Sequence, residues 1–104
     1  MLFDREGRLV EASRSNVVIV DAQERLLTPP LARGAVAGVA LEVLRARVLL
    51  LERDVSSAAL RSARAVFAVN AVRGVRPIVR LDGQPLRSAE HAFAAALAEA
   101  LGRD

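Results

Sequence analysis

The stretch that decides the fold reads Asn-Val-Val-Ile-Val, residues 16–20. It is β-branched and almost wholly apolar, which predicts a strand buried on both faces. A turn at 21–23 and a second strand at 25–27 follow, and the sequence Thr-Pro-Pro at 28–30 stops that strand because proline has no amide hydrogen for a ladder. Before the run, residues 2–9 indicate two short strands around a polar turn. These residues therefore form a β-rich first half.

The remaining sequence predicts helices alternating with strands. In order these are a helical segment opened by Gly38, a helix at 58–64 capped by Ser56 or Ser57, strands at 65–69 and 75–81, and a last helix capped by Ser88. Residues 48–51 fit either the end of the first helix or the start of a strand. On the last helix Phe93, Leu97 and Leu101 recur at four-residue spacing. The order is that of an α+β protein, and with no linker or repeat we expect a single domain, residues 1–104.

Composition excludes several classes of protein. Hydrophobic residues make up 53% of the chain and charged residues 26%, which is too apolar for a disordered tail. No apolar run approaches the roughly 20 residues of a membrane span, and no signal peptide is visible, so we expect a cytoplasmic protein without membrane contact. The absence of cysteine excludes disulfides and thiolate metal sites. All fifteen basic residues are arginines scattered along the chain, with three phenylalanines as the only aromatics, and this pattern argues against nucleic-acid binding.

Few residues are candidates for chemistry. His91 is the only histidine, so no nucleophilic dyad or zinc site can be completed, and we expect a solvated helix residue. Asp4 and Glu6 border a turn and should be exposed. Glu11 is different, since a carboxylate beside a buried strand is costly unless it is paired. A glycine at a helix start, as at Gly38, leaves free backbone amides that can bind an anion.

Three blocks in this order and spacing resemble the carboxyl-terminal part of the class IV aminotransferases. They are residues 7–16 (Gly-Arg-Leu-Val-Glu-Ala-Ser-Arg-Ser-Asn), residues 27–31 with 34–39 (Leu-Thr-Pro-Pro-Leu and Gly-Ala-Val-Ala-Gly-Val), and residues 66–78 (Val-Phe-Ala-Val-Asn-Ala-Val-Arg-Gly-Val-Arg-Pro-Ile). That family comprises fold-type IV pyridoxal-phosphate enzymes such as branched-chain and D-amino acid aminotransferases and aminodeoxychorismate lyase. The resemblance implies the carboxyl-terminal domain of the D-amino acid aminotransferase-like fold, truncated.

The resemblance also implies a cofactor site and no metal. Glu11 matches the glutamate that faces the pyridine nitrogen and keeps it protonated, and Val36 the apolar residue packed on the ring. Gly38, Val39 and Ala40 match the turn whose amides hold the phosphate, and Asn70 and Ala71 the second loop on the phosphate side. Ala40 and Leu41 stand where the aminotransferases usually have threonine and arginine. With Asn70-Ala71 and Val36 this resembles the lyase branch more closely.

The family's Schiff-base lysine matches no residue of this chain, which contains no lysine, and we assign no catalytic residue. The chain is therefore expected to be inactive alone, as the carboxyl-terminal portion of an aminotransferase or aminodeoxychorismate lyase-like enzyme. An amino-terminal half would complete the site for an amino-acid or aminodeoxychorismate-type substrate, within a homodimer. The alternative is a non-catalytic module for pyridoxal-phosphate binding or for dimerisation.

Overall fold

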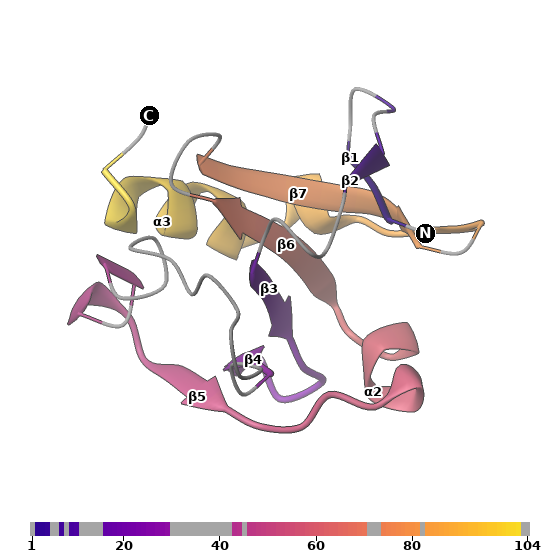
Figure 1. The fold of residues 1–104 in the computed structure, drawn as a ribbon, viewed down its shortest axis with the longest axis horizontal. Helices are drawn as coiled ribbons and strands as arrows, with labels where there is room; N and C mark the ends of the chain where they lie inside the picture. The colour runs from indigo at the N-terminus through magenta and orange to yellow at the C-terminus, as the bar shows by residue number, and fades with distance from the viewer. Residues whose placement is uncertain are drawn as a thin grey trace.

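The structure is a computed structural model that describes residues 2–4, 7, 9, 10, 16–29, 43, 44, 46–70, 74–81 and 83–102. Within these residues eight strands form one sheet, drawn in Figure 1. The strands are β1 (Leu2–Asp4), β2 (Leu9–Val10), β3 (Asn16–Val20), β4 (Leu26–Thr28), β5 (Leu50–Glu52), β6 (Ala65–Asn70), β7 (Gly74–Leu81) and β8 (Gln84–Pro85). Their order across the sheet is β2-β1-β7-β6-β3-β4-β5, and β8 pairs with β7. Only β4 and β5 run parallel.

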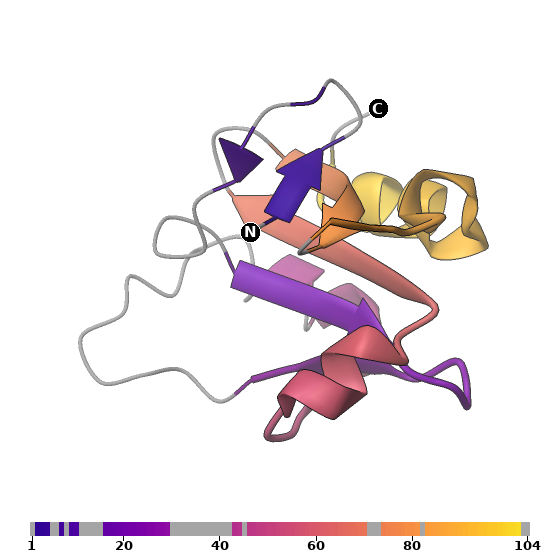
Figure 2. The ribbon, with the colours of Figure 1, turned by 90° about the vertical axis from the view of Figure 1, so that its right-hand side faces the viewer.

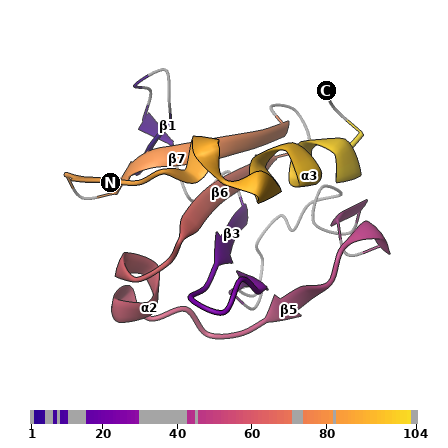
Figure 3. The same ribbon diagram turned by 180° about the vertical axis from the view of Figure 1, so that it is seen from behind.

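Three helical elements are described in full. They are α2 (Ser57–Arg61), the 3-10 turn η2 (Ser88–Glu90) and α3 (Ala92–Ala100). Helix α3 crosses β6 and β7 in the view from behind (Figure 3). Helix α2 lies on the opposite side of β6, near the start of that strand (Figure 2). Both faces of the central strands are therefore packed against a helix.

The central strands are buried on both faces, which confirms the prediction for the apolar run. Along β6, Phe67 and Val69 pack with Leu97 of α3, while Val66 and Ala68 pack with Leu60 of α2. Along β3 the same alternation puts Val18 and Val20 on the α3 side and Ile19 on the α2 side, all with 0% exposure. Successive side chains of a strand point to opposite faces, so one run of apolar residues supplies both halves of the core. Phe93 and Leu101 of α3 also pack against this core, as their spacing predicts.

Two predicted boundaries are wrong by a few residues. The second strand is Leu26–Thr28, not 25–27, and Thr28 belongs to it because it pairs with Glu52 of β5 and its carbonyl accepts from the Arg53 amide at 3.0 Å. Helix α2 ends at Arg61 and not at Arg64, since the Arg64 amide already donates to Val20 across the sheet at 2.8 Å. Of the two candidate caps, Ser56 is the one used: its Oγ accepts from the Ala59 amide at 3.0 Å. Residues 50–52 form strand β5 beside β4.

The start of the last helix also differs from the prediction. Ser88 does not cap it; the Ser88 Oγ accepts a hydrogen bond from the amide of Val66 at 2.9 Å and is fully buried. His91 caps α3 instead, because its Nδ1 accepts from the Phe93 amide at 3.1 Å. A buried backbone amide at the start of β6 needs a hydrogen-bond acceptor, and the Ser88 hydroxyl accepts from this amide instead of from the first turn of α3.

Candidate functional site

One end of the sheet brings together the strand ends that border the sequence motifs. Asn16 of β3 lies opposite Val69, next to Asn70 at the end of β6, and Asn70 pairs with Gly74 of β7. Thr28 ends β4 at the same side, as its hydrogen bond to Val17 shows. We call Asn16, Thr28, Asn70 and Gly74 the motif end of the sheet. The three motif blocks are thus continuous in sequence with neighbouring strand ends.

Most of the predicted cofactor residues lie outside the described residues. These are Glu11, Val36, Gly38, Val39, Ala40 and Ala71. Asn70 is described and is half-buried at the last position of β6. Its neighbour Gly74 is buried at φ +77, a backbone conformation that favours glycine. The structure therefore describes the strand ends that border the motifs, and the roles of the motif residues stay predictions.

The polar side chains placed at the motif end are neutral. Asn16 and Asn70 carry amides and are half-buried, and Thr28 is 1% exposed. The Thr28 hydroxyl donates its hydrogen to the Val17 carbonyl, so it can offer a ligand only its acceptor lone pairs. The side-chain amides of Asn16 and Asn70 carry N–H groups of the kind from which a phosphate oxygen accepts hydrogen bonds.

A buried ion pair lies beside the motif end, where the sequence predicted an exposed carboxylate. Asp4 is 4% exposed, and its Oδ2 accepts from Arg76 Nη2 at 2.6 Å. Arg76 stands opposite Ala68 in the β6–β7 pair, so this bond joins β1 to the central strands. The prediction for Asp4 is wrong because its partner is far along the chain; Glu6 lies outside the described residues.

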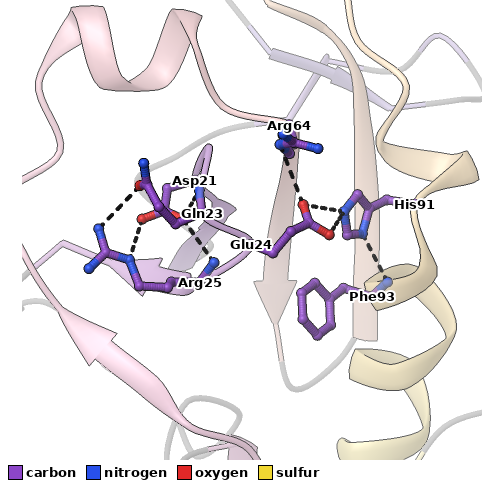
Figure 4. A network of polar contacts seen from close by, with 7 residues as sticks. All are labelled: Asp21, Gln23, Glu24, Arg25, Arg64, His91 and Phe93. Atoms are coloured by element: carbon purple, nitrogen blue, oxygen red, sulfur yellow. Dashed lines mark hydrogen bonds and ion pairs between the residues drawn. The ribbon is translucent and has the colours of Figure 1, made fainter.

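The opposite end of the sheet, which we call the turn end, comprises Val20, Leu26 and Ala65 with the turn at 21–25 between β3 and β4. Its side chains form the polar network of Figure 4. Asp21 Oδ1 accepts from the Gln23 and Arg25 amides at 3.0 and 2.8 Å, and Asp21 Oδ2 accepts from Arg25 Nε at 2.7 Å. Desolvation raises the pKa of Asp21, but the hydrogen bonds from Arg25 and Gln23 outweigh this and hold the pKa below its usual value.

His91 belongs to the same end and is not the solvated helix residue that the sequence predicted. Its side chain is 15% exposed, and Nε2 lies 3.1 Å from both carboxylate oxygens of Glu24. Since Nδ1 accepts from a backbone amide, the neutral ring carries its proton on Nε2 and donates it to Glu24. Glu24 is held at φ +63 in the turn, and Arg64 lies on its other side at 3.7 Å. The ring stacks on Phe93 with centroids 5.3 Å apart.

Two classes of feature are absent from the part of the chain that the structure describes. No group of three His, Cys, Asp or Glu side chains gathers there as metal ligands would. Among the same residues, no helix has the length and apolar character needed to span a bilayer.

Known structures share this fold. Over 84% of this chain, the crystal structure of 4-amino-4-deoxychorismate lyase from Pseudomonas aeruginosa is similar with 34% identity and a TM-score of 0.72. The branched-chain aminotransferase from Thermoproteus uzoniensis, solved with norvaline, is similar over 98% with 28% identity and a TM-score of 0.73. A hypothetical aminotransferase from Mycobacterium tuberculosis, solved in a PLP-bound form, is similar over 86% with 29% identity and a TM-score of 0.65.

The chain spans only about a third of the length of these proteins, namely 33%, 37% and 32%. No curated protein matches it. Residues 1–81 match the family described as amino-transferase class IV, whose members depend on pyridoxal phosphate. The match includes all three motif blocks and all strands from β1 to β7. This chain therefore belongs to the class IV aminotransferase family.

Proposed function

We propose that this chain contributes the carboxyl-terminal part of a pyridoxal-phosphate site in an aminotransferase or an aminodeoxychorismate lyase-like enzyme. The observation that supports the proposal is the motif end. Asn16, Thr28 and Asn70 lie on adjoining strands there, and each is followed or preceded by a segment that carries a family motif. The side-chain amides of Asn16 and Asn70 carry N–H donors, from which a dianionic phosphate ester can accept hydrogen bonds.

In this proposal each motif residue has one task. Glu11 holds a proton on the pyridine nitrogen, and Val36 packs against the ring. The amides of Gly38, Val39 and Ala40 bind the phosphate, with Asn70 and Ala71 on its other side. The bound cofactor supplies an electron-accepting ring. With alanines at positions 40 and 71, backbone N–H groups replace the hydroxyls that other members use.

A lysine from another polypeptide segment must hold the cofactor covalently, because the chain has no primary amine besides its amino terminus. We therefore propose that the chain alone is inactive. From the family resemblance we also propose that the complete enzyme is a homodimer in the cytoplasm and acts on an amino acid or an aminodeoxychorismate-type substrate.

Titration of pyridoxal phosphate into the purified chain tests the cofactor site. We expect a change in cofactor absorbance and a rise in Tm, weakened about tenfold in affinity by Glu11→Gln, which corresponds to about 1.4 kcal/mol. Glu99→Gln, an exposed substitution on α3, serves as the matched control and should bind as the native chain does. Pyridoxal without its phosphate should bind much more weakly. An unchanged absorbance and an unchanged Tm at saturating cofactor would overturn the proposal.

A second experiment separates an enzyme part from a binding module. The chain is co-expressed with the preceding two thirds of the Pseudomonas aeruginosa lyase, treated with pyridoxal phosphate and borohydride, and weighed by mass spectrometry. We expect the cofactor mass on the lyase segment and only when this chain is present. Equal labelling of the lyase segment without this chain would favour the module instead.

A further inference from the structure

A concave surface at the turn end carries an unusual density of positive charge. Its volume is about 540 Å³, and its lining includes Arg61, Arg64, Arg87 and His91, with Glu90 as the only carboxylate among the described residues. The arginines come from three places: the last residue of α2, the residue before β6, and the residue before η2. This surface lies at the other end of β6 from Asn70, so it is separate from the proposed cofactor site.

The arginines are only partly neutralised. Arg64 Nε is 3.7 Å from Glu24 Oε2, which is an ion pair but too long for a hydrogen bond. Arg87 Nε donates to Glu90 at 2.5 Å, and this side chain is 85% exposed. The Arg61 side chain makes no hydrogen bond or ion pair with another of the described residues. Guanidinium groups held around one hollow repel one another, and an anion placed between them removes that repulsion.

The lining also indicates which part of a ligand is recognised. His91 has no donor to offer, because Nδ1 accepts from Phe93 and Nε2 donates to Glu24. Its ring stacks on Phe93, and no other aromatic side chain of the described residues lines the hollow. The positively charged donors of the lining are guanidinium groups, and phosphoryl oxygens match the planar fork of arginine. Two linked phosphoryl groups present two sets of such oxygens to the three guanidinium groups.

We propose that this surface, defined by Arg61, Arg64 and Arg87, binds a small molecule through a diphosphate group. The site is open to solvent, so its affinity falls with ionic strength. Glu90 competes with the ligand for Arg87. The proposal does not depend on the pyridoxal-phosphate site.

Titration of sodium pyrophosphate, followed by the backbone amide signals of the ¹⁵N-labelled chain, tests the proposal. We expect saturable shifts at residues 61–64 and 87–91, and no saturation with sodium chloride at matched ionic strength. Arg64→Gln should weaken binding about two- to fivefold, the range expected for a partly exposed charge pair. Glu90→Gln should strengthen it by a similar factor. Thermal melting of each variant shows whether it is folded.

Arg53→Gln is the matched control, since Arg53 is exposed and bonds Glu52 near the motif end. It should bind pyrophosphate as the native chain does. Equal losses in Arg53→Gln and Arg64→Gln would show unspecific attraction to arginine and overturn the proposal. Shifts that do not saturate, or an unchanged affinity in Glu90→Gln, would also overturn it.

Discussion

The two ends of strand β6 differ in how they are held. At the Ala65 end, side chains from distant segments close the sheet: Ser88 accepts from Val66, and His91 reaches Glu24 in the turn. At the Asn70 end, backbone pairing with Asn16 and Gly74 places the strands, and the segments that border them carry the family motifs. The Ala65 end is thus held by side-chain contacts between distant segments, and the strands at the Asn70 end border the sequence motifs of the family.

The largest expected effect tests the end that carries the motifs. Asp4→Asn removes the negative partner of Arg76, whose side chain is only 16% exposed, and leaves a largely buried positive charge. We expect the free energy of unfolding to fall by about 3 kcal/mol, since breaking one half of a buried pair costs this much. Urea denaturation measures it.

The double variant Asp4→Leu with Arg76→Met provides the control, because it removes both charges and should recover most of the loss. If Asp4→Asn alone were as stable as the native chain, the ion pair between β1 and β7 would contribute little to the stability of the motif end.

The next effect concerns the Ala65 end. Ser88→Ala leaves the Val66 amide buried without its acceptor, which should cost about 1–3 kcal/mol in denaturant titrations. Ser62→Ala, whose hydroxyl is exposed on the last turn of α2, should change stability by less than about 0.5 kcal/mol. Equal effects of the two substitutions would mean that Ser88 does not hold this end of the strand.

The smallest effect is a pH dependence in the turn at 21–25. The pKa of Asp21 is lower in the folded chain than in the unfolded chain, where it is about 3.9. The ionised carboxylate therefore stabilises the fold fully above about pH 3.9, and this stabilisation is lost as the pH falls through the lower folded-state pKa. Asp21→Asn should therefore lower Tm at pH 7, and the difference in Tm should shrink as the pH falls below about 3.9. Asp54→Asn, on an exposed loop, is the control and should not alter Tm. A constant difference across this range would contradict the assignment.

The same comparison explains which features the sequence could predict. The apolar runs of β3 and β6 and the apolar spacing of the last helix are local patterns, and all three elements form, although α3 begins at Ala92 and is capped by His91, not by Ser88. Asp4, Ser88 and His91 were misjudged because their partners Arg76, Val66 and Glu24 lie 72, 22 and 67 residues away. No local pattern signals such a contact. The candidate cofactor residues can be named only through the family resemblance, since single glycines and carboxylates carry little information on their own.

The pairing of β1 with β7 has a consequence for biosynthesis. Leu2 lies opposite Leu81, so Leu2 finds this ladder partner only after residue 81 has been translated. Until then β1 has no β7 beside it, and the ion pair between Asp4 and Arg76 cannot form. Contacts this far apart in the chain slow folding, because the loop between them must close before they form. Chaperones that shield nascent chains should therefore raise the soluble yield of this protein more than that of a helical protein of equal length.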